Sequence, residues 1–213
     1  MLKLKFNALF TSLALISGIA HADVQNGHWL VRLRAIDVIP TANSNVINII
    51  GGKVNTISTQ VVPELDISYF FTSNISSELI LAVARHSVYA NNTSLGRVSL
   101  GNATLLPPTL LLQYHFLPDR CFNPYIGAGV NYTMFFNTNP GPVATSINYS
   151  NSFGPALQAG ADYAIDKNWS LNVDVKKIMI ESIVNANTAL GNLNPDVKIN
   201  PWIIGLGVGY RFG

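Results

Sequence analysis

Alternation of apolar residues with polar or small ones restricts the fold of this chain more than any other feature. It is clearest in residues 202–212 (WIIGLGVGYRF), where even positions are aromatic or branched and odd positions from 205 onward are glycine or arginine. Successive side chains of a β-strand point to opposite faces, so this spacing predicts a strand with one apolar face. The pattern recurs in residues 29–34, 64–71, 78–86, 109–116, 126–134, 156–163 and 169–176.

The composition indicates where such strands belong. Charged residues make up 11% of the chain, against about 25% in soluble domains, and hydrophobic residues make up 48%. After the first 22 residues, no segment has the 18 consecutive apolar residues of a membrane-spanning helix. A closed barrel of alternating strands suits such a chain, because it can face lipid while every backbone hydrogen bond is made between strands.

The connections between the eight segments alternate in length. Long ones run near residues 40–63, 89–108, 137–152 and 181–196, and short ones near 72–76, 117–123 and 166–168. In outer-membrane barrels the long loops lie outside the cell and the short turns lie in the periplasm. We therefore predict an all-β fold, an eight-stranded antiparallel transmembrane β-barrel with long outer loops, short periplasmic turns and both termini in the periplasm.

We expect the polar face of the strands to line the lumen. That face is rich in Gly, Ser, Asn and Ala and poor in Lys and Glu, which suits a crowded interior better than a surface in water. The alternative is a soluble barrel with its apolar face inside. Two belts of aromatic residues at the strand ends favour the membrane barrel. One belt holds Trp29, Tyr69, Phe71, Tyr114, Phe116, Tyr163, Trp169, Tyr210 and Phe212, and the other Tyr132, Phe136, Phe153 and Trp202.

The first 22 residues have the pattern of an export signal. Lys3 and Lys5 precede the apolar stretch 8–20, and Ala-His-Ala at 20–22 is a small-x-small cleavage site. We predict a cleaved signal peptide over 1–22 and an outer-membrane β-barrel over 23–213, in the outer membrane of a Gram-negative bacterium. A membrane anchor is the alternative, but the stretch is shorter than the roughly 20 residues that a spanning helix needs.

The mature chain is formally neutral. Without the two lysines of the signal, 11 of the 13 Lys and Arg residues remain, against 11 Asp and Glu. A basic surface for nucleic acid is therefore not predicted. Cys121 is the only cysteine and cannot form an internal disulfide, so we interpret it as a small turn residue.

The predicted inward face carries most of the ionisable side chains of the strands. An eight-stranded barrel is just wide enough for side chains to fill it, so these groups must pair or reach water. Two interpretations remain open, a structural plug and a narrow ion-conducting path. The predicted lumen-lining residues are Arg32, Arg34, Glu64, Asp66, Glu78, His86, His115, Asp162, Asp174, Lys176 and Arg211.

Several blocks of the chain resemble the OmpW family of small outer-membrane barrels. They are residues 29–40 (WLVRLRAIDVIP), 106–116 (LPPTLLLQYHF), 123–133 (NPYIGAGVNYT), 172–178 (NVDVKKI) and 200–212 (NPWIIGLGVGYRF). The resemblance implies an eight-stranded barrel that passes small hydrophobic molecules across the outer membrane. Its implied partners are outer-membrane lipid, a small hydrophobic ligand and the barrel-assembly machinery. Gly213 departs from the pattern, because barrels of this kind usually end on the aromatic residue that the insertion machinery reads.

The family resemblance suggests that an apolar solute enters among the outer loops and leaves sideways into the bilayer. Pro155 and Pro201 fall at the outer ends of two predicted strands. Proline cannot donate to a β-ladder, so these two residues are candidates for a lateral exit. The alternative is that they mark where strand pairing ends. Apolar residues of the long connections, such as Ile47, Ile50 and Val54, either line the entrance or pack the loops together.

Other classes of function have weaker support. Adjacent residues of a strand face opposite ways, so His86 and Ser87 cannot pair on one face. No GxSxG or HExxH motif is present, and no nucleotide, haem or metal signature. We therefore predict neither an enzyme nor a cofactor. Binding or adhesion through the long outer loops remains the alternative to transport.

Overall fold

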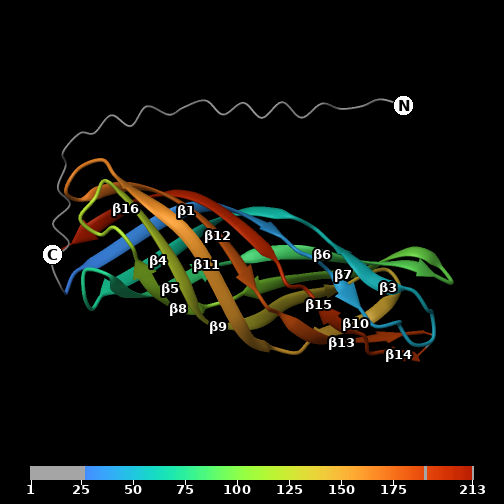
Figure 1. Cartoon of the computed structure of the whole chain (residues 1–213). Coiled ribbons are helices and arrows are strands. Elements are labelled where there is room, and N and C mark those ends of the chain that lie inside the picture. The colour runs from blue at the N-terminus through green and yellow to red at the C-terminus, as the bar shows by residue number, and fades with distance from the viewer. Residues whose placement is uncertain (1–26, 190, 213) are drawn as a thin grey trace, which may run out of the picture.

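The computed structural model describes residues 27–189 and 191–212, which form antiparallel strands joined by turns (Figure 1). The predicted signal peptide lies outside the described residues. The strands are β1 (Trp29–Ile39), β2 (Asn43–Ser44), β3 (Lys53–Ile57), β4 (Gln60–Phe70), β5 (Ile75–Ala82), β6 (Ala84–Thr93), β7 (Gly96–Leu106), β8 (Thr109–His115), β9 (Phe122–Pro140), β10 (Ala144–Tyr149), β11 (Ser152–Ala164), β12 (Trp169–Ile178), β13 (Glu181–Thr188), β14 (Gly191–Leu193), β15 (Asp196–Lys198) and β16 (Trp202–Phe212).

Eight of these strands close into a barrel. Their order is β11-β12-β16-β1-β4-β5-β8-β9, and the pairing of β9 with β11 completes the ring. The first and last strands are neighbours, with a register that runs from Trp29 opposite Phe212 to Ile39 opposite Trp202. The predicted eight-stranded antiparallel barrel is therefore confirmed, and both ends of the described chain lie at the same end of it.

The two faces of the strands differ as the alternation predicts. On β12, Trp169, Leu171 and Val173 are about half exposed, whereas Asn172 and Asp174 are buried. The apolar face therefore points outward and the polar face into the lumen. Aromatic rings pair across neighbouring strands at the end with the short turns. The ring centroids of Trp29 and Tyr69 are 4.8 Å apart, and those of Trp169 and Tyr210 are 4.9 Å apart. No helix in the described ranges is long and apolar enough to cross a membrane.

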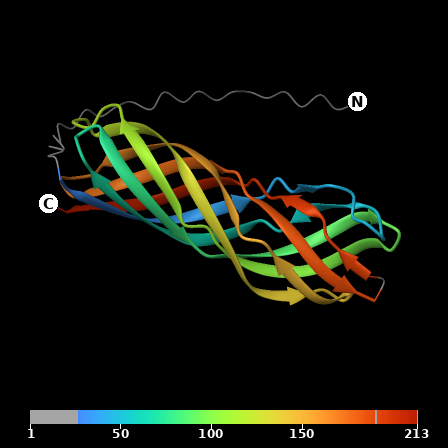
Figure 2. The same cartoon turned by 90° about the horizontal axis from the view of Figure 1, so that it is seen from below.

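The long outer connections are present as predicted, and much of their length forms β-hairpins that continue beyond the eight-stranded barrel. They extend the barrel in one direction as two sheets, β3-β6-β7-β9 and β2-β15-β13-β10 (Figures 1 and 2). Asn, Thr and Gly residues masked the alternation in these segments. Apolar residues nevertheless recur there at every second position, as at Val98 and Leu100, and both of these are buried.

The short turns close the opposite end of the barrel. In the turn between β11 and β12, Asp166 Oδ1 accepts the backbone N–H groups of Asn168 at 2.8 Å and Trp169 at 2.7 Å. These two hydrogen bonds stabilise the carboxylate and lower the pKa of Asp166. The turn thus satisfies its own backbone donors with one side chain.

Glycines on the inner face of β16 make room for the arginines of β1. A β-carbon at Gly207 would lie 2.3 Å from the Leu33 carbonyl oxygen and 2.7 Å from Arg34 Cγ.

We therefore expect Gly207→Ala to destabilise the barrel by roughly 1–3 kcal/mol, the usual cost of overpacking. The measurement is urea unfolding in lipid vesicles, followed by tryptophan fluorescence. Val208→Ala on the lipid face is the control, and an equal or smaller loss in Gly207→Ala would contradict the close-packing argument.

Candidate functional site

The lumen nearer the short turns is filled by buried charges, here called the plug. Its cations are Arg32 and Arg34 from β1 and Lys176 from β12. Because an unpaired buried charge is very costly, the plug depends on close pairing with carboxylates. These are the buried side chains of Glu64, Asp66, Glu78, Asp162 and Asp174, from β4, β5, β11 and β12.

The Arg32 guanidinium donates hydrogen bonds to side chains from three other strands. Nε donates to Asp162 Oδ1 at 3.0 Å and Nη2 to Asp162 Oδ2 at 2.7 Å. Nη1 donates to Glu78 Oε1 and to Ser68 Oγ, both at 2.9 Å. The paired bonds to Asp162 are the strong bidentate geometry that an arginine offers a carboxylate.

Arg34 and Lys176 share their carboxylates. Arg34 Nη1 lies 3.1 Å from Glu64 Oε1, 3.0 Å from Asp66 Oδ2 and 3.2 Å from Asp174 Oδ2. Lys176 Nζ contacts Glu64 and lies 3.1 Å from Asp174 Oδ2. Each cation therefore meets several anions, and the plug is one continuous network.

Neutral polar residues complete the plug, although only ionisable residues of the polar face were predicted to line the lumen. Gln158 Nε2 donates to Glu78 Oε2 at 2.9 Å and to Asp174 Oδ2 at 2.8 Å. Gln113 and Asn172 donate to the same set of carboxylates. All three lie on the inward face of their strands, so the alternation that located the charges could have located them too.

The structure does not bring every predicted lumen residue into the plug. His115 lies beside it, with its ring 4.8 Å from that of Phe70 and 5.1 Å from that of Tyr125. Arg211 is half-buried, and its buried Nε has no hydrogen-bond partner among the described residues. His86 is separate from the plug and lines an apolar cavity instead.

A buried serine and histidine meet near the plug, but not in a catalytic arrangement. Ser76 Oγ lies 3.2 Å from His115 Nε2, and Asn123 Nδ2 lies 3.0 Å from His115 Nδ1. The Asn123 amide donates to Nδ1, so Nε2 carries the proton, and Ser76 Oγ itself donates to Gln113 Oε1 at 3.0 Å. His115 therefore cannot accept the Ser76 proton, as a general base for a nucleophile must.

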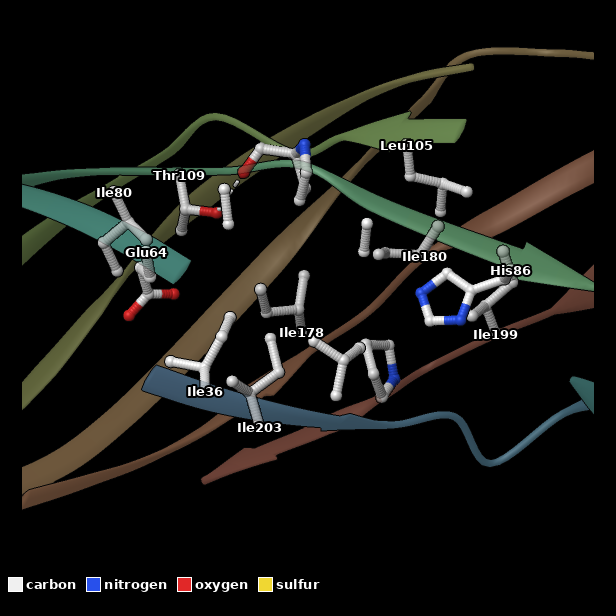
Figure 3. Close-up of a pocket in the computed structure, with 15 residues that line it drawn as sticks. Ile36, Glu64, Ile80, His86, Leu105, Thr109, Ile178, Ile180, Ile199 and Ile203 are labelled. Carbon is white, nitrogen blue, oxygen red and sulfur yellow. Dashed lines mark hydrogen bonds between the residues drawn. The ribbon is translucent and has the colours of Figure 1, made fainter. Parts of the chain in front are cut away.

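Above the plug, toward the outer strands, the lumen becomes an apolar cavity (Figure 3). Its volume is about 30 Å³, room for one or two water molecules and far less than the several hundred Å³ of a typical ligand pocket. It therefore opens to a ligand only when its walls move. It is lined by Ile36, Val38, Glu64, Ile80, Ala82, Ala84, His86, Leu105, Pro107, Thr109, Ile178, Ile180, Ile199, Pro201 and Ile203.

Two further cavities continue toward the tips of the outer strands. The second, of about 10 Å³, shares His86, Leu105 and Ile199 with the first. The third, of about 240 Å³, lies at the outer hairpin tips. Its lining is mostly apolar: Ile50, Leu95, Pro142, Val143, Thr188, Ala189 and Leu193.

The barrel wall beside the first cavity has a break in its ladder. The pairing of β5 with β8 ends at Ile80 opposite Thr109, and the pairing of β6 with β7 begins at Ala84 opposite Leu105. Residues 81–83 and 106–108 lie between these pairs in the same register but are not paired with each other. Two residues of this break, at 107 and 108, are prolines and have no N–H to donate.

Asn131 bonds to the exposed backbone of this break from inside the barrel. Its Nδ2 lies 3.1 Å from the Pro107 carbonyl oxygen, 3.3 Å from that of Pro108 and 2.8 Å from Thr109 Oγ1. These contacts satisfy carbonyls that a regular ladder would have satisfied. The Tyr132 N–H also donates to the Pro108 carbonyl oxygen at 3.0 Å. Both bonding residues belong to β9, so they fix residues 107 and 108 on one side of the break and leave residues 81–83 free of these contacts.

The two prolines predicted to mark an exit have different surroundings. Pro201 lines the first cavity, and its carbonyl accepts the Ile178 N–H at 3.4 Å. Pro155 lies within β11 opposite Val130, and its carbonyl accepts the Met179 N–H at 3.0 Å. Pro155 is not among the residues that line the first cavity.

Apolar residues of the long connections were predicted either to line an entrance or to pack the loops together. In the structure they are buried between the two outer sheets, here called the outer extension. Ile47, Ile50 and Val54 are buried in the same apolar cluster as the cavity-lining residues Ile178 and Ile203. They pack the outer strands together, and Ile50 also lines the cavity at the tips.

A closed barrel with a lipid-facing apolar exterior and a charged interior is an outer-membrane β-barrel of a Gram-negative bacterium. The chain belongs to the OmpW family, whose model matches residues 25–212. The predicted family, fold class and outer-membrane location are thereby confirmed.

Individual relatives agree with this assignment. Outer-membrane protein y4mB of Sinorhizobium fredii is 46% identical over 187 residues, which cover 86% of this chain and 80% of y4mB. The crystal structure of OprG from Pseudomonas aeruginosa matches with a TM-score of 0.81 at 28% identity, over 88% of this chain and 97% of OprG. The solid-state NMR structure of AlkL in DMPC bilayers matches with a TM-score of 0.71 at 27% identity, over 90% of this chain and 92% of AlkL.

The plug makes a quantitative prediction about stability. Arg34→Met would leave Glu64, Asp66 and Asp174 without their shared guanidinium, and we expect a loss of roughly 3–5 kcal/mol. The free energy of unfolding is measured by urea titration in lipid vesicles. The control is Arg85→Met, because Arg85 is exposed and bonds only to Asn102 among the described residues; such a surface interaction is worth about 0–1 kcal/mol. Equal losses in the two variants would contradict the role of the plug.

Proposed function

We propose that this protein passes small hydrophobic molecules across the outer membrane, from the outer strands into the apolar cavities and then sideways into the bilayer. The observation that carries the proposal is the position of the first cavity. It lies directly above the charged plug and directly beside the break in the wall.

The plug directs such a molecule away from the periplasmic end of the lumen. Glu64 lines the first cavity and is also bonded to Arg34 and Lys176. An apolar molecule moving further down would have to separate these pairs, which leaves buried charges without partners at a cost of several kcal/mol. The same close pairing favours a plugged lumen over an ion-conducting path.

The wall break offers the lower-energy route. Moving two paired strands apart costs one hydrogen bond for each ladder contact, and residues 81–83 and 106–108 have no such contacts with each other. An apolar molecule that leaves here passes from apolar side chains into lipid without crossing a polar layer. The interaction of the bilayer with the half-exposed apolar outer face is therefore part of the proposed mechanism.

Two partners of this proposal rest on the resemblance to the family. One is the hydrophobic ligand itself. The other is the barrel-assembly machinery, which would read the C-terminal strand that ends at Phe212. Surface binding through the outer hairpins is the competing function, and it requires no passage through the wall.

A removable cross-link tests the lateral exit. The register places Ala82 opposite Pro107, so Ala82→Cys and Pro107→Cys, in a Cys121→Ser background, form a pair that oxidation closes. Naphthalene uptake by intact Gram-negative cells is measured before and after oxidation. We expect oxidation to lower the rate to that of cells without the barrel and reduction to restore it.

Two outcomes of the cross-linking experiment would contradict the proposal, one for transport itself and one for the position of the exit. Uptake with the native chain no faster than in cells without the barrel, with insertion verified by a gel shift, would refute transport and favour surface binding. Barrel-dependent uptake that oxidation leaves unchanged would refute an exit at this break.

The two predicted exit prolines are tested by Pro155→Ala and Pro201→Ala. Alanine restores a backbone N–H to each position and lets the ladder strengthen. Pro201 lines the first cavity and Pro155 does not, so a stronger ladder at Pro201 would stiffen the wall of that cavity. We therefore expect Pro201→Ala to slow naphthalene uptake more than Pro155→Ala does, and less than the cross-link at the break. A larger effect of Pro155→Ala would place the exit at β11 instead.

A further inference from the structure

The second cavity is apolar except for three polar residues, His86, Tyr149 and Ser182. Among the described residues, the buried Tyr149 hydroxyl has no hydrogen-bond partner and His86 bonds through Nδ1, whereas the Ser182 hydroxyl donates to the Ser150 carbonyl at 2.8 Å. A site with few polar groups in an apolar lining is typical of one that recognises a small molecule. The protonation states of His86 and Tyr149 determine whether each side chain donates or accepts a hydrogen bond from such a molecule.

His86 offers an acceptor. Its Nδ1 lies 2.6 Å from the Ser58 carbonyl oxygen, which can only accept, so the proton is on Nδ1. Its Nε2 has no hydrogen-bond partner among the described residues. Figure 3 shows the imidazole among Leu105, Ile180 and Ile199. An imidazolium would be an isolated charge among apolar groups, so the ring is neutral and Nε2 presents a lone pair.

Tyr149 offers a donor. Its ring stacks on Phe135, with centroids 5.4 Å apart and planes inclined by 13°, which fixes its direction from β10. The hydroxyl is buried and has no hydrogen-bond partner within the described part of the chain. Burial raises the pKa of this phenol, which lies in the outer extension, so the hydroxyl keeps its proton. A buried hydroxyl without a partner is unfavourable, and a ligand could supply the missing bond.

We propose that the second cavity selects apolar molecules that carry one hydroxyl group, such as alcohols and phenols. The ligand hydroxyl donates a hydrogen bond to His86 Nε2, and its oxygen accepts a hydrogen bond from the Tyr149 hydroxyl. A pure hydrocarbon leaves both protein groups unsatisfied, whereas a carboxylate brings a charge into an apolar site and has no hydrogen for Nε2. This inference rests on the proposed transport function and names its substrate class.

The test compares 1-naphthol with naphthalene, which share one ring system and differ by one hydroxyl. Uptake of each is measured in intact Gram-negative cells by fluorescence, and the rate of cells without the barrel is subtracted. The ratio of the two barrel-dependent rates is the readout, because it cancels differences in expression. We expect the native chain to favour 1-naphthol roughly three- to tenfold, as one or two hydrogen bonds allow.

Tyr149→Phe removes only the unpartnered hydroxyl, so the barrel should fold and continue to pass naphthalene. We expect this variant, and His86→Leu, to bring the ratio close to one. Tyr132→Phe is the matched control, since that hydroxyl bonds to Asn151 at 3.0 Å and the side chain is exposed on the outer face of the barrel. It should leave the ratio unchanged.

Failure of this inference differs from failure of transport. Barrel-dependent uptake of both probes at equal rates overturns the selection for hydroxyl groups. A native preference that survives both Tyr149→Phe and His86→Leu also overturns it. Absence of barrel-dependent uptake for both probes refutes the transport function, and this inference with it.

Discussion

The need to satisfy every backbone N–H and C=O group inside hydrocarbon determines the rest of this structure. Strands can meet that need only by closing on themselves, which here brings β1 against β16. Closure with eight strands sets a lumen that side chains must fill. The chain fills it with long cationic side chains from β1, and glycines such as Gly207 on the facing strand leave the space that Arg34 occupies. The plug is thus a consequence of closure as much as of charge.

The lumen divides into two parts with different chemistry. Near the short turns, charges pair so closely that each cation meets several carboxylates. Toward the outside, isoleucine, leucine and valine replace them, and the wall loses part of its ladder at the same height. Glu64 belongs to both parts, since it lines the cavity and binds Lys176. A discontinuity in the wall is tolerable there because the Asn131 amide donates to the Pro107 carbonyl, and the Tyr132 N–H donates to the Pro108 carbonyl.

Alternation alone predicted the barrel and the inward placement of the charges, because both follow from the geometry of single strands. It did not predict the apolar cavity. Ile36, Ile178 and Ile203 come from three different strands, and each faces inward like the charged residues nearer the turns. Only the strand register shows that they lie at one level. Alternation is also hard to recognise in the outer strands, where Asn and Thr are frequent. The sequence could not show that the Tyr149 hydroxyl has no hydrogen-bond partner among the described residues. Such facts depend on contacts between residues far apart in the chain.

The distribution of the plug over the chain has a consequence for folding. Arg32 and Arg34 are made first, on β1, whereas Asp162, Asn172 and Asp174 lie more than 120 residues later. A partly assembled sheet therefore lacks the bidentate Asp162 partner of Arg32, and the Asn172 and Asp174 partners of Arg34, until β11 and β12 arrive. The network is completed only when the last strands of the barrel pair, so intermediates in which part of the sheet has entered the lipid alone are disfavoured. The charges inside the barrel thereby make its assembly cooperative, since no shorter piece of the chain can complete the network.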